Sequence, residues 1–159
     1  MLKNTGFLKS LKNALSGFFY AVKTEANLRF HLSVANLICV FGYFFGLSKF
    51  EWAMLFIAIF SVVSAELFNT SVEQAVNTAT DKICDSAKYA KDASAAAVLF
   101  LSVMALAVGV CLFGDIERIQ AALISIFTVG FSGIIPFLIL FSILIFNIWL
   151  LIFCGRKKG

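Results

Sequence analysis

The sequence predicts an all-α integral membrane protein, and three observations support this prediction. Hydrophobic residues make up 61% of the 159 residues, charged residues only 14%, and the mean hydropathy is +0.96. A soluble domain is about one-quarter charged, and a domain of this size could not bury so much apolar surface. Long charge-free runs alternate with short polar segments. This composition excludes a disordered chain, a secreted disulfide scaffold and most soluble enzymes.

The first element is a predicted amphipathic helix over residues 7–23. Apolar side chains recur there at every third or fourth position, which places them on one helical face. They are Leu8, Leu11, Leu15, Phe18 and Val22. Because lysines lie mostly off this face, we expect the helix to lie on the membrane surface. The alternative is a helix whose apolar face packs on a protein core.

Three core transmembrane helices follow, at about residues 30–48, 52–77 and 93–114. Each contains an uncharged run that can cross a hydrocarbon core, which takes about 17–25 residues. A tight polar turn at 49–51 is expected to join the first two spans, and a polar loop at 78–92 the second and third. Residues 1–114 would then form one membrane domain.

Residues 115–159 are predicted to form a C-terminal extension. After a short turn at 115–118, the chain is uncharged from 119 to 155, which would span about 55 Å as one helix and must break. The helix breakers are Gly130, Gly133 and Pro136. We therefore expect an interfacial helix over about 119–131 and a fourth transmembrane helix over about 134–154. Two short re-entrant pieces are the alternative.

Charge placement predicts the orientation of the chain in a bacterial cell membrane. Four spans place eleven basic residues on one side, and only Lys49 and Arg118 on the other. The eleven are Lys3, Lys9, Lys12, Lys23, Arg29, Lys82, Lys88, Lys91, Arg156, Lys157 and Lys158. The positive-inside rule then predicts that both termini are cytoplasmic. The net charge of +4 is accordingly attributed to the membrane surface, and no nucleic-acid partner is expected.

The segment 66–77, with the sequence ELFNTSVEQAVN, is the most informative for function. Glu66 and Glu73 are two helical turns apart and share a face, with Asn69 between them and Asn77 one turn further. A carboxylate close to hydrocarbon is costly and marks function by default. A polar seam between helices is the alternative, but two acids with no basic partner on their stripe would repel each other.

Three further polar residues are expected at the same cytoplasmic depth: Glu25, Lys91 and Asp92. Mg²⁺ is bound by one or two carboxylates together with phosphate oxygens, and a lysine offsets phosphate charge. This set predicts a site for Mg²⁺ and a nucleoside triphosphate at the membrane surface. No glycine-rich phosphate loop is present, which excludes that kind of soluble-kinase mechanism. The alternative is a non-catalytic scaffold or transporter subunit.

Three segments carry a family resemblance: KTEANLRFHL, AELFNTSVEQAV and AKDASAAAVL. Over about residues 8–113 the chain resembles the prokaryotic diacylglycerol kinase family of integral membrane lipid kinases, and the form TE-x-N-x-R-x-H-L is similar to its Gram-positive, largely undecaprenol kinase branch. The resemblance implies a homotrimer with composite cytoplasmic active sites. It also implies transfer of the γ-phosphate of MgATP to a lipid hydroxyl, of undecaprenol or of diacylglycerol.

The resemblance also implies a role for each matched residue. Glu66 corresponds to the catalytic base at the lipid hydroxyl, and Glu25 and Glu73 to carboxylates that hold the metal with ATP. The remaining nucleotide-site positions are Asn69, Lys91, Asp92 and Gly17. Arg29 corresponds to a basic residue near the substrate, although membrane anchoring explains it equally well.

Four residues need separate comment. Asn77 stands where the family usually has Asp, Lys82 where an acid is common, and Cys84 where His is common. These departures leave the nucleotide selectivity open. His31 fits the Gram-positive branch, either as a catalytic residue or as a polar residue at the membrane edge.

Overall fold

The computed structural model describes residues 5–79, 84–131 and 134–152, and in these residues all regular secondary structure is helical. The helices are α1 (Thr5–Thr24), α2 (Ala26–Phe45), α3 (Lys49–Ala79), α4 (Asp85–Phe113), α5 (Ile116–Phe131) and α6 (Ile134–Ile152). Three of them, α2, α3 and α4, are long and apolar enough to cross a membrane. The predicted all-helical, multi-pass membrane protein is therefore confirmed, with three candidate spans.

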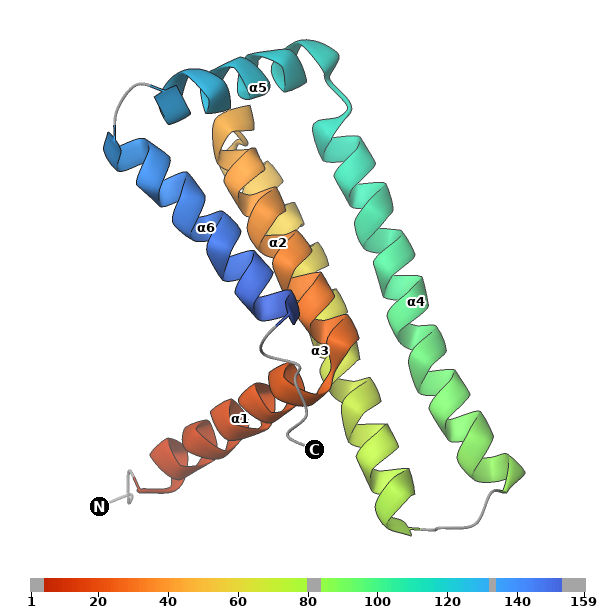
Figure 1. Cartoon of the computed structure of the whole chain (residues 1–159). Coiled ribbons are helices and arrows are strands. Elements are labelled where there is room, and N and C mark those ends of the chain that lie inside the picture. The colour runs from red at the N-terminus through yellow and green to blue at the C-terminus, as the bar shows by residue number, and fades with distance from the viewer. Residues whose placement is uncertain (1–4, 80–83, 132–133, 153–159) are drawn as a thin grey trace.

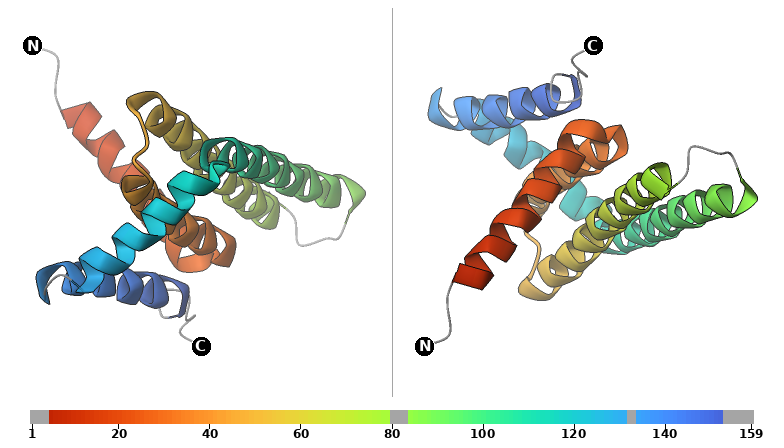
Figure 2. Two further views of the ribbon diagram at one scale, coloured as in Figure 1. Left: turned by 90° about the horizontal axis from the view of Figure 1, so that it is seen from above. Right: turned by 90° about the horizontal axis from the view of Figure 1, so that it is seen from below.

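The three candidate spans run side by side, and α1 and α5 lie at opposite ends of them (Figure 1). Seen from above, α5 crosses from α4 over the end of α2 toward α6; seen from below, α1 lies across the other end (Figure 2). The most extensive helix pair is α3 with α4, and α6 packs on α2 and α5. We call the two ends of the bundle the α1 end and the α5 end.

The turn between α2 and α3 lies at residues 46–48, earlier than the predicted turn at 49–51, which is helical. Gly46 adopts the left-handed conformation, with φ of 73°, and the N–H groups of Gly46 and Leu47 bond the carbonyls of Tyr43 and Gly42. Such a motif ends a helix within one turn. Ser48 and Glu51 then exchange side-chain-to-backbone hydrogen bonds in a capping box that starts α3 at once.

The prediction of a polar loop at 78–92 is wrong for most of these residues. Helix α3 continues to Ala79, and α4 begins at Asp85, eight residues before the expected span. With 31 residues, α3 is about 46 Å long, well beyond an apolar core of about 30 Å. Polar residues end a membrane span but do not end a helix, so both helices project beyond the apolar region at the α1 end.

The C-terminal extension divides into two helices, as the length of its uncharged run predicted. Helix α5 begins at Ile116, so most of the expected turn at 115–118 is helical. The side chain of Asp115, just before the helix, accepts a hydrogen bond from the N–H of Arg118. Helix α6 turns back along α2, and its residues Phe141–Ile152 form an apolar helix shorter than the three candidate spans (Figure 1). Residues 153–154 of the predicted fourth span lie outside the described residues.

Two small apolar cores stabilise the ends of the bundle. At the α1 end, Ala21, Val22 and Leu28 pack around the junction of α1 and α2, and Leu150 of α6 joins them. At the α5 end, the buried residues come from α2, the α2–α3 turn, α3 and α5: Phe45, Leu47, Leu55 and Ala122. Helix α4 has no buried residue along its 29 residues. The core domain is thus a thin helical layer rather than a closed globule.

Candidate active site

Glu66 is a buried carboxylate at the α1 end of the spans. Only 2% of its side chain is exposed, and its Oε1 has no hydrogen-bond partner among the described residues. The Nε2 atom of His31, on α2, lies 3.3 Å from this oxygen. One turn further along α3, the Thr70 hydroxyl is satisfied by the backbone carbonyl of Glu66. The carboxylate is therefore held in the interior with one oxygen that makes no hydrogen bond to the described residues.

The other two predicted metal-site carboxylates, Glu25 and Glu73, both repel the charge of Glu66. Glu25 lies in the junction between α1 and α2, immediately before α2, and makes no side-chain capping bond. Glu73 is on α3 and, like Glu25, is half-buried. The fold therefore brings three acidic groups from two elements into electrostatic range of one another. Such a concentration of negative charge is stable only if a cation or a proton compensates it.

Asn69 connects the acidic stripe of α3 to α4. Its Nδ2 donates to Glu73 Oε1 at 3.0 Å, and its Oδ1 accepts from the Ser94 hydroxyl at 2.7 Å. Ser94 also lies 2.9 Å from the carbonyl of Lys91. Ser94 is not among the residues predicted from the sequence, although it is three residues after Lys91 and would share its face on a helix. The expected loop at 78–92 concealed that spacing.

Lys91 and Asn77, on α4 and α3, are joined by a hydrogen bond. The ammonium group of Lys91 donates to Asn77 Oδ1 at 2.7 Å, which pins α4 to the last turns of α3. Because the partner is a neutral amide, the lysine charge is not neutralised. Asp92 and Cys84 are exposed, and Lys82 lies outside the described residues.

Arg29 and Gly17 occupy different surroundings from the acidic cluster. Arg29 is 6% exposed and its guanidinium donates to the carbonyls of Val22 and Lys23, at the end of α1. These bonds satisfy carbonyls that the end of a helix leaves free, and they fix the junction that carries Glu25. Gly17 lies on exposed α1 with open space where a side chain would point.

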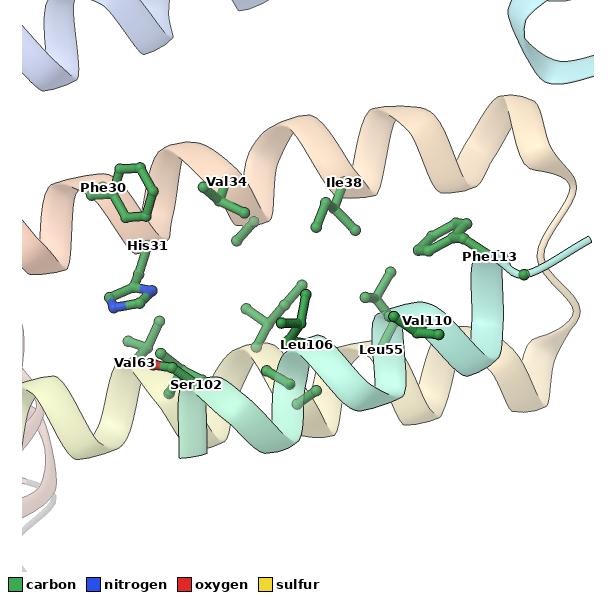
Figure 3. Close-up of a pocket in the computed structure, with 17 residues that line it drawn as sticks. Phe30, His31, Val34, Ile38, Leu55, Val63, Ser102, Leu106, Val110 and Phe113 are labelled. Atoms are coloured by element: carbon green, nitrogen blue, oxygen red, sulfur yellow. The ribbon is translucent and has the colours of Figure 1, made fainter. Parts of the chain in front are cut away.

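An apolar groove of about 660 Å³ runs between α2, α3 and α4. Its described lining contains only two polar side chains, His31 and Ser102, and the Ser102 hydroxyl has no hydrogen-bond partner there. Figure 3 shows both near one end of the groove, with the His31 ring pointing from α2 toward Val63 of α3. Phe113 lies near the other end. Since His31 also contacts Glu66, the groove ends beside the buried carboxylate.

The described residues contain no group of three or more His, Cys, Asp or Glu side chains that could hold a metal ion by themselves. Mg²⁺ does not require such a cage, because it is usually bound by one or two carboxylates, water and substrate phosphates. Glu25 and Glu73 fit that donor set. The fold and site therefore define a small helical membrane protein with a carboxylate–amide–lysine cluster beside an apolar groove.

The chain belongs to the prokaryotic diacylglycerol kinase family, whose sequence profile matches residues 12–113. It is accordingly a lipid kinase of a bacterial membrane, and kinases use a nucleoside triphosphate with a divalent metal. The matched region ends with α4, so α5 and α6 lie beyond it.

Two relatives show the range of acceptors named in the family. The chain is 37% identical over 107 residues to the undecaprenol kinase of Bacillus subtilis (strain 168). This matched stretch covers 67% of this chain and 87% of that protein. It is 33% identical over 106 residues to the diacylglycerol kinase of Synechocystis sp. (strain PCC 6803), covering 66% of this chain and 61% of that protein. No solved structure gives a significant match.

Proposed function

We propose that the protein transfers the γ-phosphate of MgATP directly to the hydroxyl group of undecaprenol, at the cytoplasmic face of the membrane. One observation carries this proposal: the apolar groove ends at His31, in contact with the buried Glu66. A lipid chain lying in that groove would present its polar head to a carboxylate. An aqueous substrate would not need such a groove.

The lining of the groove favours a polyprenol over diacylglycerol as the acceptor. A polyprenol has one hydroxyl at the end of a hydrocarbon chain, whereas diacylglycerol carries two ester groups beside its hydroxyl. Buried polar groups need hydrogen-bond partners, and beyond His31 the described lining offers only the Ser102 hydroxyl. The 37% identity to an undecaprenol kinase agrees with this choice. Diacylglycerol remains the second candidate, because the Synechocystis relative is named a diacylglycerol kinase.

In this mechanism Glu66 accepts the proton of the lipid hydroxyl as its oxygen attacks the γ-phosphorus. A lipid alcohol has a pKa far above neutrality and needs such a base. Glu25 and Glu73 would hold Mg²⁺, which neutralises phosphate charge when bound. Lys91 neutralises phosphate charge directly, and Asn69 orients Glu73 through their hydrogen bond.

Three more residues have proposed roles of lower specificity. Asp92 and Gly17 are assigned to the nucleotide by family resemblance. Arg29 is assigned a substrate contact on the same ground, but its bonds to Val22 and Lys23 support a structural role in positioning Glu25.

The proposed topology places the α1 end in the cytoplasm, with α1 on the membrane surface and α6 as a fourth span. Leu8, Leu11 and Leu15 are 46–63% exposed, which leaves apolar side chains of α1 available to a membrane surface. With four spans the C-terminus is also cytoplasmic. A reporter fused after Gly159 should be active only inside the cell, and activity only outside would overturn the four-span topology.

The proposed catalytic unit is a homotrimer of the domain 1–114, with sites shared between subunits. Helix α4, which has no buried residue, supports this arrangement, because the helices of a single chain do not enclose the site. The extension 115–159 would be an addition to that unit.

The decisive experiment is phosphorylation with radiolabelled ATP, with undecaprenol and diacylglycerol tested side by side in mixed micelles. We expect phosphate transfer to undecaprenol at the higher rate. A preference for diacylglycerol would select the second candidate. Failure of the detergent-solubilised protein to bind MgATP would overturn both and favour a non-catalytic scaffold or transporter subunit.

A further inference from the structure

His31 has a contact that the proposed mechanism does not yet use. Its Nε2 atom lies 3.3 Å from Glu66 Oε1, an oxygen with no hydrogen-bond partner among the described residues. We propose that His31 is the positioning residue of Glu66 and receives from it the proton of the acceptor hydroxyl. This inference rests on the proposed kinase function, with Glu66 as the base.

The exposed fractions of Glu66 and His31 indicate the direction of proton transfer. Only 2% of the Glu66 side chain is exposed, against 23% for His31. A proton that reaches Glu66 from the lipid would therefore be held in the interior, beside hydrocarbon. If it remained there, the carboxylic acid could not act as a base in the next turnover. His31 is the neighbour that touches the carboxylate and has the larger exposed fraction.

The groove adds an independent geometric reason. His31 and Ser102 are its polar lining residues, and both lie near the end that meets Glu66 (Figure 3). A lipid chain filling the groove would cover this end and exclude water from the Glu66 side. Proton exit through the groove would then be blocked during the reaction. The imidazole in contact with Glu66 would take the proton from the carboxylate and hold it until the lipid phosphate leaves the groove.

Proton transfer accompanies phosphoryl transfer. As the lipid oxygen bonds to the γ-phosphorus, the bond from that phosphorus to the β–γ bridging oxygen breaks and ADP leaves. The hydroxyl proton moves to Glu66, then from Oε1 to Nε2 of His31, which becomes an imidazolium ion. His31 releases one proton to water, and both groups return to their starting states. The net reaction consumes ATP and lipid alcohol and yields ADP, lipid phosphate and one proton.

The charged groups around the pair are acidic. Glu25 at the start of α2 and Glu73 on α3 both act on the charge of Glu66. The described groove lining from α4 contributes only the uncharged Ser102 and apolar residues or glycines. An imidazolium formed beside Glu66 would therefore face negative charge, which favours proton arrival. The proton then leaves when the lipid phosphate departs and water returns to this end of the groove.

The test compares wild type, His31→Ala and His31→Gln in the undecaprenol assay, across a pH series and with added imidazole. We expect kcat to fall about 100-fold in both variants with little change in KM for ATP. The acidic limb of the wild-type pH–rate profile, where protonation of His31 and of Glu66 both stop transfer, should change to the limb set by Glu66 alone. Free imidazole should restore His31→Ala, more strongly as the pH rises and the imidazole becomes neutral.

Two controls keep the outcomes separate. Glu66→Gln should gain nothing from imidazole, because its base is missing. His31→Gln retains a polar side chain and is the deciding variant if His31→Ala does not assemble. Wild-type rate and pH profile in His31→Gln, or no imidazole rescue of a folded His31→Ala, would overturn the role of His31 and leave the kinase function intact. A wild-type protein without kinase activity would instead overturn the proposed function.

Discussion

The two ends of the helical bundle differ in whether their charged side chains have bonding partners. At the α5 end, Arg118 donates to Glu51 at 3.1 Å and to the carbonyl of Gly46 at 3.2 Å, and its guanidinium lies 4.2 Å from the centre of the Phe45 ring. At the α1 end, Glu66 is buried with an unbonded oxygen, and both neighbouring acids repel it.

We interpret this difference as that between a structural polar network and the proposed active site. The Arg118 network ties α5 to the α2–α3 turn and satisfies its own charges, so it needs no ligand. The acidic cluster at the α1 end has His31 as a neighbour but no described lysine or arginine bonded to its carboxylates. Buried polar groups in native proteins are almost always satisfied, so an exception of this kind points to function. The predictions below test that contrast.

The largest effect is expected for Glu66→Gln. Glutamine keeps the shape of the side chain but cannot accept the proton of the acceptor, so kcat should fall about 10²–10⁴-fold. ATP binding should be retained, because Glu66 is not assigned to the metal. Turnover and ATP affinity measured on the same preparation check this. Loss of ATP binding with normal chemistry would exchange the roles of Glu66 and Glu73.

Glu73→Gln should have the next largest effect, on nucleotide use as well as on turnover. Removing one metal-binding charge should raise the Mg²⁺ and ATP concentrations needed for half-maximal rate by about tenfold or more. Glu25→Gln should behave in the same way. The matched control is Glu51→Gln, the same substitution at the α5 end, which should leave both concentrations unchanged. ATP titrations at several Mg²⁺ concentrations separate these outcomes.

The sequence predicted the acidic stripe of the site but not the partners that the fold brings to it. Glu66, Asn69 and Glu73 share a helical face by spacing alone, and this is what the structure shows. The approach of His31 to Glu66 and of Ser94 to Asn69 depends on how α2 and α4 lie against α3. A single sequence carries no direct information on that register.

The helices themselves followed from hydropathy, and the errors concern their ends. Uncharged runs located α2, α3 and α4, because crossing a membrane requires hydrocarbon-compatible residues. The polar residues 85–92 were assigned to a loop, although helical backbone bonds continue in water as well as in lipid. Gly46 marked the end of α2 more accurately than charge did, since it is the one described residue with positive φ.

Truncation after Phe113 should have a smaller effect on phosphoryl transfer. The family match ends at residue 113, so we expect a measurable fraction of the kinase activity to remain. The loss should be in stability, because Leu150 of α6 is 5% exposed and packs on Ala21, Val22 and Leu28, beside Glu25.

The milder variant Leu150→Ala isolates that contact. Because Leu150 lies in a packed core, this substitution should lower the free energy of unfolding by about 2–5 kcal/mol. The value of kcat should be nearly unchanged. Activity and thermal unfolding in the same detergent measure both. Complete inactivity of a correctly inserted, oligomeric truncation would show that the extension helps to build the active site.

The smallest effect is expected at the α5 end, in Glu51→Gln. The hydrogen bond from Arg118, together with bonds from Ser48, lowers the pKa of Glu51 from 4.5 to about 2. Glu51 precedes the apolar run of α3 and is partly exposed, so its contribution to stability is small. Kinase activity should stay at the wild-type level, because the site lies at the other end of the bundle.

The pH dependence of this small contribution has a definite sign. Since folding lowers the pKa, the ionised Glu51 favours the folded state, fully so above about pH 4.5. The contribution is lost as the pH falls from about 4.5 toward 2. Wild type should therefore unfold at a slightly higher temperature than Glu51→Gln at neutral pH, and the difference should shrink over that acidic range. Arg118→Gln should lose at least this increment, because it also removes the bond to the Gly46 carbonyl and the contact with the Phe45 ring. The contribution of the shared pair should be lost only once in the double variant. A Glu51→Gln protein with impaired catalysis would end the contrast between the two ends, since a satisfied ion pair would then contribute to a distant site.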